Sequence, residues 1–362
     1  MHGDLEEEIH TAPPAGLDKD FPQIPGEVWR LRRPLYGLKQ APRQWHAKLK
    51  TTLQSLGLSP LHGDPSLFVR KDSQNNWVLV YVDDMLLVSK SDAALDKLRD
   101  QLRTHFPMKD LGAVSQYLGM EVTRNWDRHE VYIGQTKYVQ EVLERFEWTE
   151  GKEYCTPLAV NHGLRAFQEG DEVHPDQDRY PELIGSLMYL MVCTRPDIAH
   201  AVSVLARFVG PGRHGGAHWK AGLRVLGYLK RTQDHKLVLG GSSTSLVGHS
   251  DSSWADDLQD RKSSQGHCFS LGSGVISWKA SRSPAVALST CEAELYAACS
   301  ASPEAVWLGE MLSLLGYPQD PPPTLWCDNE STVSLTKEAA FSGRSKHIEA
   351  RYYFVFWFSA SD

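Results

Sequence analysis

The feature that most constrains the fold is a pair of consecutive aspartates, Asp83 and Asp84, inside a run of apolar residues. The run reads WVLVYVDDMLLV and follows a shorter apolar stretch, SLFVR, with the polar segment KDSQNN between them. Adjacent side chains of a strand point to opposite faces, and burying an unpaired charge is costly. The two acids must therefore lie at an exposed turn or be held by cations, and Mg²⁺ is a cation that carboxylates bind together with substrate phosphates. A plain hairpin turn is the simpler alternative.

Apolar periodicity predicts further helices and strands along the chain. Apolar side chains recur at helical spacing in residues 44–57 before Gly57, and residues 91–106 open with a Ser-Asp helix-start signal. Helices are also expected at 136–146, 180–207, 217–231 and about 289–315. Strands are expected at 66–70, 77–82, 84–89, 116–124, 130–135, 246–253, 267–272, 275–280 and 324–329. The polar, acidic segment 160–180 is expected to be a loop, and residues 240–245 (GGSSTS) a flexible join.

Positive charge is concentrated in two windows, although the whole chain has a net charge of −7. Residues 28–50 contain seven cations and no acid, and residues 203–240 contain seven cations and one acid. Tryptophan, tyrosine and phenylalanine residues lie between the cations in both windows. Such basic, aromatic stripes suit a nucleic-acid backbone. A solvated helix face is the alternative.

A second set of acids lies in residues 246–350. Asp251 is expected near the end of a strand, Glu292 and Glu294 at the start of a helix, and Asp328 at the end of a later strand. Two helix positions that are two residues apart differ by about 200°, so only one of the two glutamates can face the strand. A strand Asp, a helix Glu and a strand-end Asp in this order are how an RNase H-like fold gathers acids around two metal ions. Each acid alone would be an ordinary surface charge.

Several other classes of protein are disfavoured. The six cysteines have no CxxC spacing, which argues against a zinc knuckle and favours free thiols in a reducing, intracellular compartment, cytoplasmic or nuclear. The 15 histidines include no HExxH motif, and neither a phosphate-binding GxxxxGK[ST] loop nor a GxSxG hydrolase motif is present. No apolar run reaches the roughly 18 residues that a membrane helix needs. The acidic start, MHGDLEEEIH, does not form a signal peptide.

The motifs resemble a known family. YVDDMLLVS is similar to the metal-binding hairpin of reverse transcriptases. The surrounding sequence resembles the Pol polyprotein of copia-type LTR retrotransposons through GDLEEEI, LYGLKQAPRQWH, GDPSLFV, MKDLG, YLGMEV, ELIGSLMYL and TRPDIAHAVSVLARF. The RNase H domain of the same family is resembled by five further segments, SDSSWADD, DRKSSQGH, ISWKASRS, ALSTCEAEL and WCDN.

The resemblance implies roles for the first site. Asp83 and Asp84 would bind Mg²⁺, with Mn²⁺ as a substitute, and Tyr36 and Gly37 would hold the incoming dNTP. Lys109 would lie near the departing pyrophosphate. Tyr117, Gly119, Gly185 and Tyr189 would contact the primer–template, the first two in a primer grip and the last two on a thumb helix. On that helix Leu183, Leu187 and Leu190, at helical spacing, would be core residues.

For the second site the resemblance implies that Asp251, Glu294 and Asp328 bind metal. Glu292 would point outward. Lys279 and Arg282 would contact the phosphates of an RNA–DNA hybrid, whose RNA strand would be cleaved.

The expected fold is α+β, a partial reverse-transcriptase palm and thumb followed by an RNase H-like mixed-sheet domain. Residues 1–128 would form partial fingers and palm, residues 129–240 the thumb and connecting helices, and residues 246–362 the incomplete RNase H-like domain. The partners would be an RNA template, a DNA primer, an RNA–DNA hybrid and dNTP, with no membrane, and the oligomeric state stays open. The family places a further Asp before GDLEEEI and a further carboxylate after KHIE. The alternative is therefore an inactive remnant that only binds nucleic acid.

Overall fold

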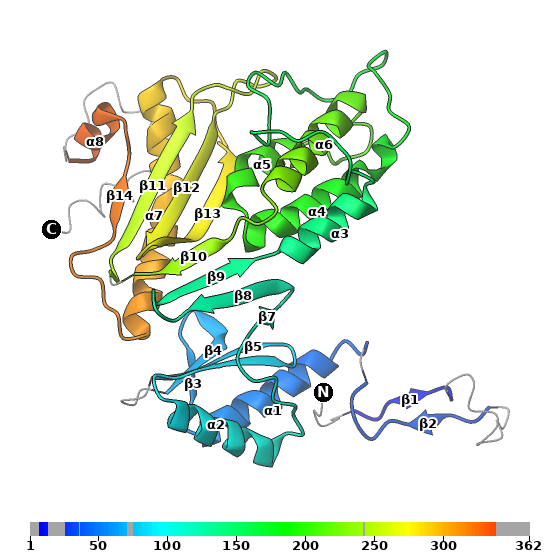
Figure 1. The fold of residues 1–362 in the computed structure, drawn as a ribbon, viewed down its shortest axis with the longest axis vertical. Coiled ribbons are helices and arrows are strands. Elements are labelled where there is room, and N and C mark those ends of the chain that lie inside the picture. Colours follow the sequence, from blue (N-terminus) through cyan, green and yellow to red (C-terminus); the bar gives the residue numbers. More distant parts are fainter. Residues whose placement is uncertain (1–6, 14–25, 36, 71–74, 242, 338–362) are drawn as a thin grey trace. The chain divides into compact units, whose positions relative to one another are not determined.

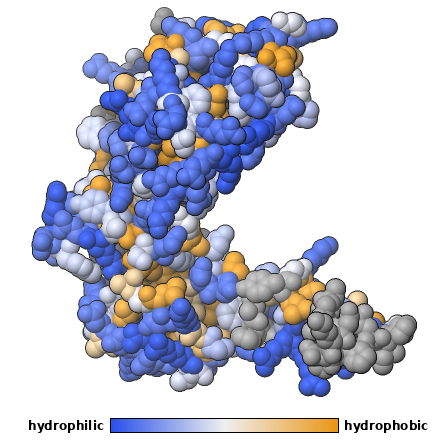
Figure 2. All heavy atoms as spheres, turned by 45° about the vertical axis from the view of Figure 1, so that its right-hand side comes forward, coloured by the Kyte–Doolittle hydropathy of each residue, from blue (hydrophilic) through white to orange (hydrophobic). Residues whose placement is uncertain are grey.

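The computed structural model describes residues 7–13, 26–35, 37–70, 75–241 and 243–337. It divides into two compact units, residues 1–112 and residues 113–362. The described residues form eight α-helices and four sheets, which confirms the expected mixture of α and β structure. Figure 2 shows a face on which hydrophilic atoms predominate and hydrophobic atoms form small patches. Among the described helices, none is long and apolar enough to cross a bilayer.

The first unit contains an antiparallel sheet of order β3-β4-β5-β6, with helices α1 and α2 packed against it (Figure 1). Its elements are β1 (His10–Thr11), β2 (Trp29–Arg30), α1 (Ala41–Ser55), β3 (Ser59–Leu61), β4 (Asp64–Arg70), β5 (Asn76–Tyr81), β6 (Asp84–Val88) and α2 (Asp92–His105). One cluster joins both helices to the four-stranded sheet, and Leu53 of α1, Phe68 of β4, Val78 of β5 and Leu98 of α2 are fully buried in it. The sheet therefore presents its β5–β6 turn from a well-packed support.

The ends of both helices follow local chemistry. Helix α1 begins earlier than the apolar spacing predicted, because Pro42 is tolerated in a first turn, where its missing N–H has no helical partner. Gly57, with a φ of +83°, ends the same helix as expected. At the start of α2, the Ser91 side chain accepts a hydrogen bond from the Ala94 amide, which confirms the predicted start signal.

The second unit begins with a sheet and a group of helices. Its elements are β7 (Gln116–Tyr117), β8 (Met120–Asn125), β9 (Glu130–Gly134), α3 (Thr136–Arg145), α4 (Tyr180–Cys193), α5 (Ala199–Ala206), α6 (Gly216–Arg231) and β10 (Leu237–Gly240). Helices α3 to α6 share one core, in which Leu183, Leu187 and Leu190 are fully buried, as predicted. Strand β10 was not predicted. It is short, and it is fixed by antiparallel pairing with the distant β9.

Residues 180–207 are helical as predicted, except for a break between α4 and α5. Pro196 opens a short 3₁₀ turn there, and the Arg195 side chain turns inward. The Arg195 guanidinium is only 3% exposed, and it forms an ion pair with Asp197 (2.7 Å) and donates a hydrogen bond to the Thr232 carbonyl (3.2 Å) at the end of α6. A buried cation without such partners would be costly. The break thus anchors α4 and α5 to α6.

The rest of the second unit is a mixed sheet of order β13-β12-β11-β14. Its elements are β11 (Leu246–Ser253), β12 (Ser264–Leu271), β13 (Gly274–Arg282), α7 (Thr290–Leu314), β14 (Thr324–Trp326) and α8 (Glu330–Lys337). Strands β11, β12 and β13 are antiparallel, whereas β14 runs parallel to β11. Helix α7 packs on this sheet through Ala301, Ala305 and Leu308, which share a core with Phe269 of β12 (Figure 1).

Polar contacts join helices α4 and α5 to this sheet and its loops. The Trp278 indole N–H of β13 donates to the Met191 carbonyl of α4 at 2.8 Å. Arg207, just beyond α5, forms an ion pair with Asp257 (3.0 Å) in the loop between β11 and β12. Both side chains of this pair are largely buried, and the Arg207 charge helps to lower the pKa of Asp257, against the opposing effect of burial.

Candidate functional site

The β5–β6 hairpin carries the two consecutive aspartates to the surface. A two-residue turn, Val82–Asp83, joins the strands, so that Tyr81 and Asp84 are cross-strand partners. Val82 has a φ of +57°, and its carbonyl accepts a hydrogen bond from the buried Trp45 indole at 2.6 Å. Asp83 and Asp84 are both exposed, as the cost of burying charge requires.

Trp45 is a site residue that sequence reasoning missed. Its position on the apolar face of α1 indicated only a core residue. The indole N–H was the available signal, because a buried tryptophan usually finds an acceptor for it. That acceptor lies at the turn next to Asp83, so α1 fixes the conformation of the residue that precedes the acids.

The structure describes two of the three residues that were predicted to contact the nucleotide. Gly37 is exposed and has a φ of +97°, a conformation that favours glycine. Lys109 is exposed in the segment after α2, and Tyr36 lies outside the described residues. In the described part of the chain, no group of three potential metal-ligand side chains includes Asp83 or Asp84.

The predicted primer-grip and thumb residues meet in the second unit. The Tyr189 hydroxyl of α4 donates to the Leu118 carbonyl at 2.8 Å, in the turn between β7 and β8. Gly119 follows with a φ of +74°, and a Cβ atom there would clash with the Tyr189 hydroxyl. The Tyr189 ring also packs edge-on against Tyr138 of α3, with 4.9 Å between ring centroids. The structure therefore joins Tyr117, Gly119 and Tyr189 in one local assembly.

The outer face of α4 is an exposed stripe. Gly185, Met188, Tyr189 and Val192 recur at the spacing of one helix face and are all exposed. A Cβ atom at Gly185 would meet nothing within 4 Å. The opposite face of α4 forms the core, so burial of the leucines fixes the orientation of this stripe.

The second set of acids gathers where β11, α7 and β14 meet. Because β11 and β14 are parallel, their carboxyl ends lie at the same edge of the sheet. Asp251 is exposed on β11, and Asp328 is exposed two residues beyond β14. Glu294 of α7 is 5% exposed, and it accepts a hydrogen bond from the Ser252 amide at 3.0 Å. Potential ligand atoms of Glu294, Cys327 and Asp328 all lie within 4.8 Å of one another.

Charge and burial both perturb this cluster. Burial, together with the negative charges of Asp251 and Asp328, raises the pKa of Glu294 to about 7. A carboxyl group with a raised pKa among like charges becomes fully ionised when a cation offsets the repulsion. The donor set thus fits a divalent cation, since hard cations prefer carboxylate oxygens.

The expectation that Glu292 points outward is wrong. Its side chain is 7% exposed, and it accepts hydrogen bonds from the Leu288 amide (2.7 Å) and from the Tyr296 hydroxyl. Ser289 caps the same helix start by accepting from the Glu292 amide at 3.2 Å. The loop before α7 covers Glu292, so this side chain stabilises the helix start.

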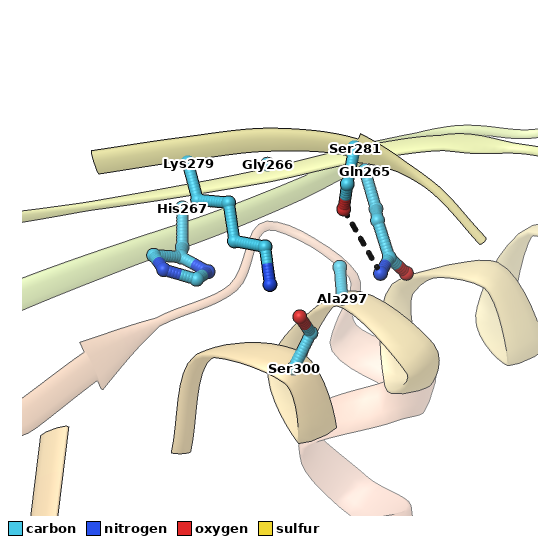
Figure 3. A pocket seen from close by; sticks show the side chains of 7 residues that line it. All are labelled: Gln265, Gly266, His267, Lys279, Ser281, Ala297 and Ser300. Atoms are coloured by element: carbon cyan, nitrogen blue, oxygen red, sulfur yellow. Dashed lines mark hydrogen bonds between the residues drawn. The ribbon is translucent and has the colours of Figure 1, made fainter. Parts of the chain in front are cut away.

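Lys279 and Arg282 lie on β13 in different surroundings. Figure 3 shows Lys279 beside His267 in a polar recess between the sheet and α7, with Ser300 opposite. Arg282 forms ion pairs with Asp260 (2.8 Å) and with Asp257 (3.4 Å), the partner of Arg207. Lys279 and Arg282 are both exposed, and Arg282 has carboxylate partners within the chain.

Several cations of the basic segment 203–240 contact partners within the chain. Arg207 is paired with Asp257, Lys220 forms an ion pair with Glu172 at 2.5 Å, and the Arg224 guanidinium lies 4.5 Å from the ring centroid of Tyr154. The net positive charge of residues 203–240 is thus a weaker indicator of nucleic-acid binding than the number of cations alone suggested.

Comparison with known proteins adds an independent finding. A family model described as "Reverse transcriptase (RNA-dependent DNA polymerase)" matches residues 1–160. The "Retrovirus-related Pol polyprotein from transposon TNT 1-94" of Nicotiana tabacum is 40% identical over 98% of this chain and 27% of its own length. The Pol polyproteins from transposons RE2 and RE1 of Arabidopsis thaliana are 35% and 34% identical, each over 98% of this chain and 24% of the relative. The chain thus spans about a quarter of the length of these relatives.

Two glycine substitutions are expected to change stability in opposite directions. Gly119→Ala should lower the free energy of unfolding by about 1–3 kcal/mol, because its positive φ is strained for alanine and the methyl group meets Tyr189. Gly185→Ala should raise it by about 0.5–1 kcal/mol, because alanine favours a helix and the position is open. Urea denaturation measures both. A Gly119 variant as stable as the parent would contradict the packing of this turn.

Glu294→Gln is expected to stabilise the protein at pH 8 in the presence of a chelator, by on the order of 1–3 kcal/mol. Above the folded pKa of about 7, both states carry the charge and only the folded state bears the cost of burying it. Below the ordinary pKa of 4.5, both states are protonated, so the substitution should have little effect at pH 4. Thermal unfolding at the two pH values measures the difference. Glu310→Gln, at an exposed position of the same helix, is the control. Equal stabilisation by Glu294→Gln at both pH values would exclude a charge effect.

Proposed function

The chain belongs to the reverse transcriptase family found in the Pol polyproteins of copia-type retrotransposons, and on this basis we propose that it acts in RNA-directed DNA synthesis. The observation that carries the proposal is the β5–β6 hairpin, which exposes Asp83 and Asp84 at the end of two apolar strands. The substrates are an RNA template, a DNA primer and dNTP. This function is assigned to the palm and thumb segments, residues 1–128 and 129–240.

In this proposal Asp83 and Asp84 hold Mg²⁺, or Mn²⁺ in its place. A cation bound there would supply the charge that activates an attacking hydroxyl and offsets negative charge on a leaving group. The Trp45 hydrogen bond fixes the turn that positions the two acids. Gly37 and Tyr36 hold the nucleotide, and the ammonium group of Lys109 serves the departing pyrophosphate.

We propose that the second unit holds the duplex beside its exposed α4 stripe. Gly185 permits close approach, and Met188 and Val192 offer apolar contact to sugars. Tyr189 is held by Leu118 and Tyr138, so it is ordered before a duplex binds. Tyr117 and Gly119 lie in the turn region that Tyr189 supports.

We further propose that residues 246–362 form an RNase H-like domain that cleaves the RNA strand of an RNA–DNA hybrid. The supporting observation is that ligand atoms of Glu294 and Asp328 lie within 4.8 Å of each other beside a sheet of order β13-β12-β11-β14, where the charge of Asp251 on β11 also acts on Glu294. These three acids would hold divalent cations, whose charge would favour the activation of water and offset charge on the leaving oxygen. Lys279 contacts hybrid phosphates, and Arg282 does so after exchanging its Asp260 partner. An inactive protein that only binds nucleic acid is the alternative that the two assays below distinguish.

Asp83→Asn and Asp84→Asn are each expected to reduce primer extension on an RNA template by on the order of 100-fold or more, because each removes charge that holds the cation. Incorporation of labelled dNTP with Mg²⁺ or Mn²⁺ measures the effect. Asp127→Asn, at an exposed turn between β8 and β9, should leave extension unchanged. A parent protein that binds the primer–template but never extends it would support the binding-only alternative.

Asp328→Asn is expected to abolish cleavage of the RNA strand in an RNA–DNA hybrid. The affinity for the hybrid should stay within about threefold of the parent value, because affinity that does not depend on base sequence comes mainly from phosphate contacts. Gel analysis of labelled hybrid measures cleavage, and fluorescence anisotropy measures binding. The exposed Asp234, beyond α6, provides the control Asp234→Asn. Unchanged cleavage by Asp328→Asn would refute the assignment of this site.

A further inference from the structure

The carboxylate cluster of the second unit includes a thiol that the proposed reaction does not use. Cys327 lies between the end of β14 and Asp328, and its Sγ is 3.8 Å from Oε2 of Glu294. Potential ligand atoms of Cys327, Glu294 and Asp328 are within 4.8 Å of one another, the one group of this kind among the described residues. Three ligand atoms of two chemical kinds therefore converge.

Burial provides a second indication of a ligand. Glu294 is 5% exposed, and while its Oε1 accepts from the Ser252 amide, its Oε2 faces the Cys327 thiol. A thiol is a weak hydrogen-bond donor. Within the described structure this oxygen thus lacks the strong donor that a buried carboxylate normally requires, and a cation would satisfy it. Asp328 is exposed, so an ion could enter from solvent.

The spacing of sulfur and oxygen fits a tetrahedral ion. With zinc–sulfur and zinc–oxygen bonds of about 2.3 Å and 2.1 Å and a tetrahedral angle, the two ligand atoms would be about 3.6 Å apart. The observed separation of Sγ and Oε2 is 3.8 Å. Mg²⁺, a hard cation, prefers octahedral oxygen ligands and has little affinity for a thiol.

We propose that Glu294, Cys327 and Asp328 form a binding site for a thiophilic divalent cation, Zn²⁺ or Cd²⁺, which excludes Mg²⁺ from the carboxylates. The Cys327 thiol loses its proton to solvent when the sulfur–metal bond forms, and a water molecule completes the four ligands. The consequence for hybrid cleavage rests on the proposed function, but the binding site does not. Because the soft ion uses two of the three acids, its binding and Mg²⁺ binding are mutually exclusive.

The test is a titration of the metal-free chain with Cd²⁺, followed by the ultraviolet thiolate-to-cadmium charge-transfer band. The parent is expected to bind one Cd²⁺ with this band. Cys327→Ser should lose the band and bind Cd²⁺ on the order of 10- to 100-fold more weakly, because a direct ligand is gone. Cys155→Ser, which removes an exposed thiol far from the cluster in sequence, is the matched control and should behave as the parent. A Cys327 variant with the parent's band and affinity would overturn the proposal.

A second variant separates this inference from the proposed function. Asp328→Asn should weaken binding of both Cd²⁺ and Mn²⁺, whereas Cys327→Ser should weaken only Cd²⁺ binding, with Mn²⁺ followed by electron paramagnetic resonance. Far-ultraviolet circular dichroism confirms that each variant is folded. Loss of Mn²⁺ binding in Cys327→Ser would overturn the division between hard and soft ions. If no variant or parent cleaves hybrid, the proposed function fails, while the Cd²⁺ result still decides the thiophilic site.

Discussion

The cost of taking carboxylates out of water governs both candidate sites. An acid that is to meet a cation and a phosphate must lie near apolar scaffolding, which gives it a fixed position, yet burial penalises its charge. At the β5–β6 hairpin, alternate residues of β5 are buried, and a two-residue turn exposes Asp83 and Asp84. At the β11–β14 edge, Asp251 and Asp328 stay exposed, and only Glu294 is buried. Its raised pKa reflects the electrostatic cost of this arrangement.

Helix α4 links the core of the second unit to its surface. Its buried leucines fix the rotation of the helix about its own axis, so the exposed stripe is set by packing and not by the stripe residues themselves. The Tyr189 hydroxyl then ties the C-terminal part of this helix to the β7–β8 turn, and the Trp278 indole ties the same part to β13. Elements far apart in sequence are thereby held in register within one unit.

Local signals were readable from the sequence, whereas signals that depend on distant partners were not. The Ser91 cap, the Gly57 stop and the buried leucines of α4 follow from rules that involve a few neighbouring residues. The break at Arg195 depends on Thr232, 37 positions away, and β10 depends on pairing with β9. Helical phase correctly predicted that only one of the two glutamates contacts β11, and that residue is Glu294. It could not reveal that the loop before α7 covers Glu292.

The thiol beside Glu294 is understandable from the same electrostatic constraint. A buried carboxylate needs a neighbour that fills space and satisfies its oxygen, but a lysine or arginine there would form an ion pair and compete with any incoming cation. A cysteine is small, largely apolar and only a weak donor, so it fills the volume and leaves the Oε2 lone pairs accessible. The same softness that makes the thiol a mild neighbour for a carboxylate makes its thiolate a strong ligand for Zn²⁺ or Cd²⁺. A site built in this way for hard cations therefore carries an intrinsic affinity for soft ones.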